Sequence, residues 1–269
     1  MSGGNSAKAY LREAGSGTAV VCLHCSASTS GQWRALMDLL AGRYHVIAPD
    51  LYGSGKTPPW PAERPMWLDD QIALLAPAFE RAGKRFHLVG HSYGGAIALK
   101  AALRLPTKLK SLVLYEPVLF SVLLSDAPHS EAAREIMGVR DDSAHLGPEA
   151  VAERFIDYWM GAGTWAAMPG SRRVALAQAV GSMKPEWHSA FNEPTPLEAW
   201  RALDVPTLLL TGRASTAAAR GVARLLAGVL PRVRVEELEG AGHMAPVTHP
   251  GRVNPLIERF LSQGVNRLD

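Results

Sequence analysis

A serine lies between glycines in the run GHSYGG at residues 90–95. An apolar stretch precedes this run and a helix-forming stretch follows it, which predicts a tight strand-to-helix turn that exposes the Ser92 hydroxyl. Glycines suit such a turn, because side chains there would collide with the neighbouring strand and helix. The helix N-terminus also supplies free backbone N–H groups beside the serine. The pattern indicates a nucleophile; the alternative is a structural turn whose serine caps the helix.

A serine hydroxyl needs a general base to become a good nucleophile. His243 is the candidate, because it lies in GAGHM at residues 240–244, directly after the last predicted strand. The loops that follow parallel strands meet at one edge of the sheet, where sites form. His91 adjoins the nucleophile but is expected to point elsewhere. Structural roles are expected for the remaining histidines, which are His24, His45, His87, His129, His145, His188 and His249.

A serine–histidine pair also needs an anion that orients the imidazole and stabilises its charged form. Glu116 is the candidate, because it ends a predicted strand and would lie at the carboxyl edge of the sheet. Three alternatives remain open: Glu116 as a surface residue, a water-mediated dyad, or an acid from the helical region such as Asp126.

Short apolar runs alternate with helical patterns along the chain, which predicts an α/β fold with a mostly parallel central sheet flanked by helices. The expected strands are 19–24, 44–49, 86–90, 111–116, 206–211 and 232–238, and the expected helices are 32–40, 67–81, 93–103 and 217–229. An alternating run at 8–12 predicts an antiparallel edge strand. Pro77 predicts a kink or a break in its helix.

The strand–helix rhythm stops between residues 117 and 200. No strand is predicted there, and residues 131–137, 149–160 and 172–183 have amphipathic helical patterns. We therefore expect a helical lid at 118–200, inserted into a core formed by 1–117 and 201–269. Most of its tryptophans and methionines are expected to fill its own small core. A few are expected to face a substrate cavity, because pockets favour domain interfaces.

The composition narrows the class of protein. The chain has 269 residues with a net charge of +3, 47% hydrophobic and 20% charged residues, which excludes a disordered or low-complexity chain. No apolar run approaches the ~20 residues of a membrane span, and the N-terminus lacks a signal pattern, so a cytoplasmic location is expected. Basic residues are scattered, which argues against a nucleic-acid partner. Cys22 and Cys25 lack a second ligand pair, so they are expected to be small apolar groups rather than a zinc or redox site.

These motifs resemble the α/β-hydrolase fold superfamily. His24-Cys25-Ser26 is similar to the family's oxyanion loop, although Cys25 stands in place of its glycine, and residues 50–55 are similar to its D-x-x-G-x-G turn. The order serine, acid, histidine is also the family's. The resemblance implies that the Ser26 N–H joins the Tyr93 N–H as an oxyanion donor. His24 is expected to brace its loop, and Asp50 its glycine turn.

The family's commonest acid position follows the strand expected at 206–211, and here it holds Ser215. Helix N-capping is expected to explain Ser215 and Thr216. Certain haloalkane dehalogenases are similar to this chain in carrying a glutamate after the strand that here ends at Glu116. Those enzymes and epoxide hydrolases use an aspartate nucleophile, so Ser92 argues against both activities.

Together these features predict a serine esterase that cleaves carboxylic esters of small apolar substrates, with lactones and thioesters as related substrates. Ser92, His243 and Glu116 would act through an acyl-enzyme, without metal or organic cofactor, in a monomer or homodimer. One alternative is a C–C bond hydrolase of a dienoic keto acid, which an arginine in the pocket would favour; Arg154, Arg172 and Arg173 are the candidates. The other is a non-catalytic small-ligand receptor on the same fold.

Overall fold

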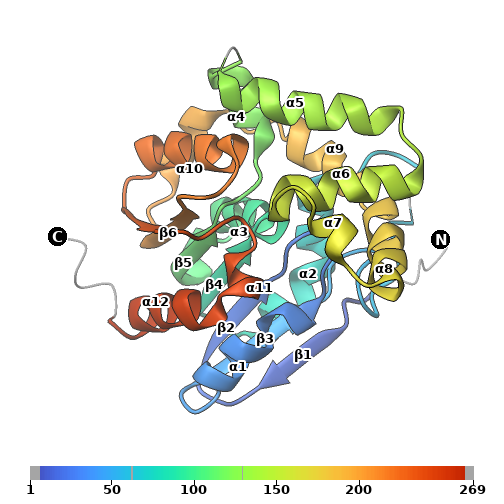
Figure 1. The fold of residues 1–269 in the computed structure, drawn as a ribbon. Coiled ribbons are helices and arrows are strands. Elements are labelled where there is room, and N and C mark those ends of the chain that lie inside the picture. Colours follow the sequence, from blue (N-terminus) through green and yellow to red (C-terminus); the bar gives the residue numbers. More distant parts are fainter. Residues whose placement is uncertain (1–6, 62, 129, 264–269) are drawn as a thin grey trace, which may run out of the picture.

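A seven-stranded sheet forms the centre of the protein (Figure 1). The computed structural model describes residues 7–61, 63–128 and 130–263. The strands are β1 (Leu11–Ala14), β2 (Thr18–Leu23), β3 (Tyr44–Pro49), β4 (Phe86–His91), β5 (Leu109–Tyr115), β6 (Thr207–Gly212) and β7 (Val233–Leu238). Their order is β1-β3-β2-β4-β5-β6-β7. Only β1 pairs antiparallel, with β3, so the other six strands end at the same edge of the sheet.

Helices cover both faces of the sheet, because the central strands are mostly apolar and are buried along almost their whole length. Val20 and Cys22 pack with α1 (Arg34–Leu40) and α12 (Pro250–Ser262) on one face. The alternate residues Val21 and Leu23 contribute to the core on the other face, as the two-residue period of a strand requires. That core also holds residues of α2 (Leu68–Arg81), α3 (Tyr93–Arg104) and α10 (Ala217–Val229). The remaining short helices of the core are η1 (Ser30–Trp33), η2 (Pro106–Lys108) and α11 (Ala245–Thr248).

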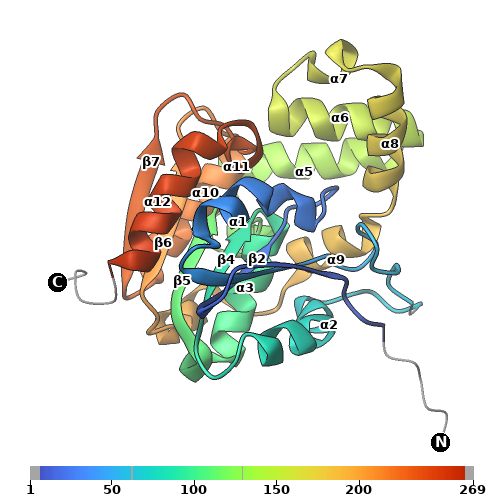
Figure 2. The same ribbon diagram turned by 90° about the horizontal axis from the view of Figure 1, so that it is seen from below.

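The chain between β5 and β6 is helical, and its described residues contain no strand. Its helices are α4 (Phe120–Asp126), α5 (Glu131–Ala144), α6 (Pro148–Met160), α7 (Thr164–Ala167), α8 (Gly170–Gly181), α9 (Lys184–Asn192) and η3 (Leu197–Ala202). We call α4 to α9 the helical insertion. Figures 1 and 2 show α5 to α8 gathered to one side of the sheet.

The sequence patterns locate all seven strands to within a few residues. The edge strand lies at Leu11–Ala14 rather than at 8–12, and it is antiparallel as expected. The predicted break at Pro77 does not occur, because α2 continues to Arg81. Pro77 lies on the exposed face of α2, where water can bond the carbonyl group that proline leaves without a donor.

Candidate active site

Ser92 lies on the sharp turn between β4 and α3, with φ 56° and ψ −119°. This strained conformation depends on two close backbone approaches. A Cβ atom on Gly90 would lie 2.4 Å from the Gly94 carbonyl oxygen, and one on Gly94 would lie 2.4 Å from the Leu23 carbonyl oxygen. The Ser92 amide donates to the Tyr115 carbonyl at 3.0 Å, which fixes the turn to β5. The turn therefore presents the Ser92 hydroxyl at the carboxyl edge of the sheet.

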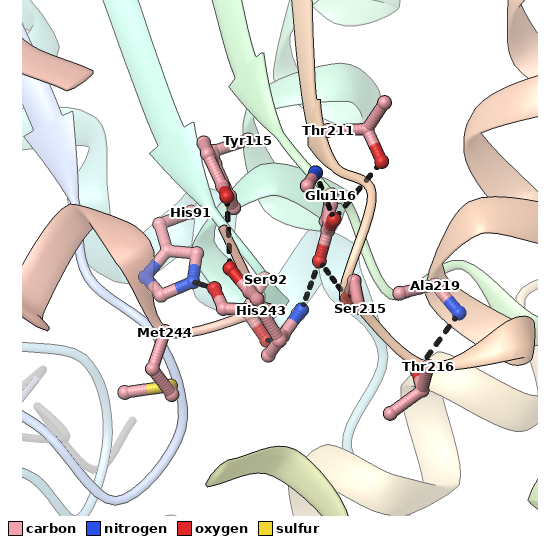
Figure 3. A network of polar contacts seen from close by, with 12 residues as sticks. His91, Ser92, Tyr115, Glu116, Thr211, Ser215, Thr216, Ala219, His243 and Met244 are labelled. Carbon is pink, nitrogen blue, oxygen red and sulfur yellow. Dashed lines mark hydrogen bonds and ion pairs between the residues drawn. The ribbon is translucent and has the colours of Figure 1, made fainter. Parts of the chain in front are cut away.

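His243 reaches Ser92 from the loop that follows β7 (Figure 3). Its Nε2 atom lies 2.9 Å from the Ser92 Oγ atom, and both side chains are buried. Two neighbours hold the loop: the Tyr115 hydroxyl donates to the Gly242 carbonyl at 2.8 Å, and the His91 Nε2 atom lies 2.9 Å from the His243 carbonyl oxygen. The imidazole is thus oriented to accept a proton from the serine hydroxyl.

Glu116 completes a serine–histidine–glutamate chain. Its Oε2 atom lies 2.7 Å from the His243 Nδ1 atom, while its Oε1 atom accepts from the Gly212 amide at 2.7 Å and the Thr211 hydroxyl at 2.9 Å. Burial alone would raise the pKa of this fully buried carboxyl. The hydrogen bond and charge of His243, with the Gly212 and Ser215 donors, hold the pKa below its ordinary value instead. Glu116 is accordingly an anion that faces the imidazole.

Ser215 does not act as the helix cap that its position suggests. Its hydroxyl donates to the Glu116 Oε2 atom at 2.6 Å. Thr216 alone is the N-cap of α10, because its hydroxyl accepts from the Ala219 amide (Figure 3). The capping expectation is therefore wrong for Ser215 and right for Thr216.

The other candidate acid and the other histidines lie elsewhere. Asp126 is exposed at the end of α4 and accepts from the Ser125 hydroxyl, so the structure does not bring it to His243. His45 pairs with Glu13, His87 with Ser111 and His249 with Thr248, and the His188 ring packs edge-on against Trp67. His129 lies outside the described residues, and His145 follows α5.

A second hydrogen-bonded chain approaches His243 from the opposite side. The Cys25 amide donates to the Gln32 Oε1 atom at 3.0 Å, and the Gln32 amide group lies 3.1 Å from the His91 Nδ1 atom. Burial lowers the pKa of His91 well below its ordinary value, so this imidazole is neutral. With Nδ1 accepting, His91 Nε2 donates to the His243 carbonyl. The sequence placed His91 away from the nucleophile but gave no sign of this link.

The backbone N–H groups of Tyr93 and Ser26 remain candidates for an oxyanion hole. Both residues line the same pocket as Ser92. Within the described residues neither amide donates a hydrogen bond. His24 braces the Ser26 loop as expected, because its two ring nitrogens bond the Cys25 carbonyl at 2.7 Å and the Leu51 amide at 3.1 Å.

Asp50 ties down its glycine turn, also as expected. Its Oδ2 atom accepts from the Lys56 amide at 2.9 Å, and its Oδ1 atom accepts from the Ser30 amide at 2.6 Å. The two cysteines are free and buried. Burial raises the pKa of both thiols, to about 12 for Cys25, which opposes the reactive thiolate that redox chemistry needs.

A cavity of about 180 Å³ opens beside Ser92 and His243. Most of its wall comes from the helical insertion and is apolar; these residues include Phe120, Ile136, Val139, Phe155, Ile156, Trp159, Leu176, Met183, Trp187 and Phe191. The Trp159 ring centroid lies 4.0 Å from that of His243. The side chains of Arg172 on α8 and Glu186 on α9 also line the cavity. The helical pattern predicts the helix that carries Trp159 but not which of its residues face the cavity.

This arrangement can perform nucleophilic acyl chemistry, because a hydroxyl, a base and an orienting anion lie within hydrogen-bonding distance of one another beside a cavity. The chain belongs to the Alpha/beta hydrolase family, whose sequence profile matches residues 20–256. Within its described residues, no helix is both long and apolar enough to cross a membrane.

Several characterised proteins are similar to this chain. The 2-hydroxymuconate semialdehyde hydrolase of Pseudomonas sp. (strain CF600) is 27% identical, over 94% of this chain and 90% of the relative. The pimeloyl-[acyl-carrier protein] methyl ester esterase of Aeromonas hydrophila subsp. hydrophila is 26% identical, over 92% and 96%. A solved structure, that of an alpha/beta hydrolase enzyme from a Medee basin deep-sea metagenome library, has a TM-score of 0.79 at 19% identity, over 96% of this chain and 95% of the other. That structure shows a shared fold.

Proposed function

We propose that the protein hydrolyses carboxylic esters of small, largely apolar acids through an acyl-enzyme. The observation that carries this proposal is the unbroken chain from the Ser92 hydroxyl through His243 to the buried Glu116, opening on an apolar cavity. The similarity to a methyl ester esterase supports it.

In the first half of the reaction, Ser92 Oγ attacks the ester carbonyl while His243 Nε2 takes its proton. Glu116 keeps the other ring nitrogen protonated and stabilises the imidazolium that forms. The amides of Tyr93 and Ser26 would hold the negative carbonyl oxygen, and each such donor is worth roughly 3–4 kcal/mol in the transition state. The imidazolium then protonates the leaving alcohol, and the acyl group remains on Ser92.

In the second half, His243 takes a proton from water, which attacks the acyl-enzyme. The imidazolium then returns the proton to Ser92 Oγ as the bond to the acyl carbon breaks and the acid is released. The cavity limits the acyl group. Its volume of about 180 Å³ is slightly above that of an engineered apolar cavity of ~150 Å³ that binds benzene. We therefore expect esters of short acids, and we infer that the helical insertion serves as the lid that forms this wall.

Labelling with a fluorophosphonate probe tests the proposal, because only an activated serine reacts quickly. We expect fast labelling of the wild-type protein at Ser92 and none of Ser92→Ala. A panel of p-nitrophenyl esters should show turnover that is lost in the same variant. Slow labelling equal to that of a denatured sample, with no ester turnover, would instead support a non-catalytic receptor.

One observation favours a second function, hydrolysis of a C–C bond in a dienoic keto acid. Arg172 lines the cavity, and no hydrogen bond or ion pair of its side chain is found within the described residues, so it is able to meet a substrate carboxylate. The similarity to a 2-hydroxymuconate semialdehyde hydrolase points the same way.

Arg172→Gln separates the two functions. If the protein is a C–C hydrolase, this change should lower kcat/KM for a keto-dienoate at least about tenfold, since it removes a charged contact. Arg173→Gln is the matched control, because Arg173 lies over the Trp165 ring and outside the cavity lining. If the protein hydrolyses simple esters but not the keto-dienoate, only the esterase function remains supported.

A further inference from the structure

Glu186 is a buried carboxyl that the proposed reaction does not use. It lies in the first turn of α9, is 4% exposed and lines the cavity together with Ser92 and Ser26. The Ser26 hydroxyl donates to its Oε2 atom at 2.5 Å. This bond joins the helical insertion to the loop that carries a candidate oxyanion donor. A carboxyl in such an apolar wall is costly unless it is hydrogen-bonded, so one with a single partner suggests a ligand.

The other carboxyl oxygen of Glu186, Oε1, has no partner among residues 7–61, 63–128 and 130–263. No hydrogen bond to Oε1 and no ion pair of this carboxyl occurs within the described residues. Although it lacks a partner there, Oε1 is not one of the fully buried polar atoms. It therefore retains some accessible surface. Because the residue is almost fully buried and lines the cavity, we assign that surface to the cavity wall.

We propose that Glu186 is a subsite for a substrate hydroxyl, so that the preferred substrates are 2- or 3-hydroxyacyl esters. This inference rests on the proposed esterase function. Ser26 determines where on the substrate this hydroxyl must be, because the Ser26 amide would bind the ester carbonyl oxygen while its side chain bonds Glu186. A hydroxyl on the second or third carbon of the acyl chain therefore lies within reach of the carboxyl.

The protonation of Glu186 explains why a hydroxyl suits the site best. Burial raises the pKa of Glu186 to about 7, against the opposing effect of the Ser26 hydrogen bond. Near neutral pH the carboxyl is therefore present in both forms. A hydroxyl accepts a hydrogen bond from the protonated form and donates one to the ionised form. A ketone fits only the protonated form, an ammonium group only the ionised form, and a carboxylate is repelled by the ionised form.

Two titratable neighbours of Glu186 stay neutral across this range. Tyr93 and Cys25 are its titratable neighbours on the nucleophile turn and the Ser26 loop, and burial raises the pKa of each, so both stay neutral. On its own helix, the Ser189 hydroxyl bonds both the Glu186 carbonyl and the Tyr93 hydroxyl. Arg172 and His243 also line the cavity, so each rate is compared with that of the unsubstituted ester at the same pH.

The test compares ethyl butyrate, ethyl 3-hydroxybutyrate, ethyl 3-aminobutyrate and ethyl acetoacetate by acid release. We expect the wild-type kcat/KM to favour the hydroxy ester over the butyrate by about tenfold at both pH 6 and pH 8, as one hydrogen bond permits. The keto ester should be favoured at pH 6 only and the amino ester at pH 8 only. Each value is taken relative to butyrate at the same pH, which removes any effect of pH that all four esters share.

Two variants separate recognition from folding. Glu186→Leu should bring the hydroxy-to-butyrate ratio close to one, and the ratio is the readout because loss of the Ser26 bond lowers both rates. Glu186→Gln should keep the hydroxy preference but remove the pH dependence of the keto preference. Equal wild-type turnover of hydroxy ester and butyrate overturns the subsite alone, and a preference for 2-hydroxyethyl butyrate overturns its placement on the acyl side. Failure to hydrolyse any ester overturns both the subsite and the esterase function.

Discussion

Ser215 Oγ and His243 Nδ1 bond the same oxygen of Glu116, at 2.6 Å and 2.7 Å. Ser215 follows β6 and Glu116 follows β5, so adjacent parallel strands bring two side chains to one point beside the imidazole. The commonest acid position of the family therefore remains next to the histidine, but here it holds a hydrogen-bond donor to a glutamate from the neighbouring strand.

Removing the charge of Glu116 should nearly abolish catalysis. We expect Glu116→Gln to lower kcat by about 10³–10⁴, because a neutral amide no longer fixes the tautomer or stabilises the imidazolium. The measurement is ester turnover normalised to folded protein, with Asp126→Asn as the control that stays near the wild-type rate. Full activity of Glu116→Gln, with a loss in a Ser215 or Asp126 variant, would contradict the assignment.

The acid should also tolerate transfer to β6. Because Ser215 Oγ lies beside the Glu116 carboxylate, we expect the double variant Glu116→Gln with Ser215→Asp to be at least about tenfold faster than Glu116→Gln alone, since it restores an anion beside Nδ1. Ser215→Asp in the wild-type background should lose activity, because two carboxylates would then meet. No recovery in the double variant would show that only β5 can orient the imidazole.

Glu116 should make stability depend on pH in acid. Its pKa in the folded protein lies below the ordinary value of 4.5, so the ionised form stabilises the fold above that pH. This contribution is lost as the pH falls through the lower folded-state pKa, where the carboxylate is protonated. Urea unfolding between pH 7 and pH 3 should show a smaller loss of stability for Glu116→Gln than for the wild type. If the free energy of unfolding falls equally with pH in both proteins, other carboxyls cause the loss of stability in acid.

Gln32 should support both loops that flank the nucleophile. Gln32→Leu leaves the Cys25 amide and the His91 Nδ1 atom without partners, which should lower Tm by about 2–8 °C. We also expect kcat to fall more than KM rises, because the loops of His243 and Ser26 lose their common support. Gln32→Glu keeps the bond from the Cys25 amide but loses the bond to His91, so its Tm should lie between those of the wild type and Gln32→Leu.

The cavity wall should set the acyl chain length. Leu176 lines the cavity from α8, so Leu176→Ala should move the preferred p-nitrophenyl ester to a longer acyl chain, by about the volume of the atoms removed. Val174 lies on the same helix but is 61% exposed and outside the cavity lining, so Val174→Ala is the matched control. An unchanged chain-length profile in Leu176→Ala would place the acyl group elsewhere.

The sheet and the positions of Ser92, His243 and Glu116 follow from local patterns. Apolar runs of strand length mark the strands, and each of the three residues follows such a run, so the shared edge of a parallel sheet predicts their approach. Helix α10 matches its predicted bounds because Thr216 caps it.

Features that depend on how the insertion meets the core were not predictable. Helix α9 has only nine residues and no side-chain cap, so its pattern is weak, and it carries Glu186, whose partner Ser26 is 160 residues away in sequence. The contact of Trp159 with His243 similarly joins separate parts of the chain. Ser215 was misassigned because a plausible local role, capping, competed with a bond to a residue 99 positions away.

The separation of Ser92 and His243 by 151 residues has a consequence for the newly made chain. The ribosome adds residues at about 5–20 per second, so the serine exists for roughly 8–30 s before its proposed base has been made. Throughout that interval the proposed mechanism leaves Ser92 an unactivated alcohol, because a serine hydroxyl needs a base. Under the proposed mechanism, activity therefore begins only after the last strand and the loop that follows it have been made and folded.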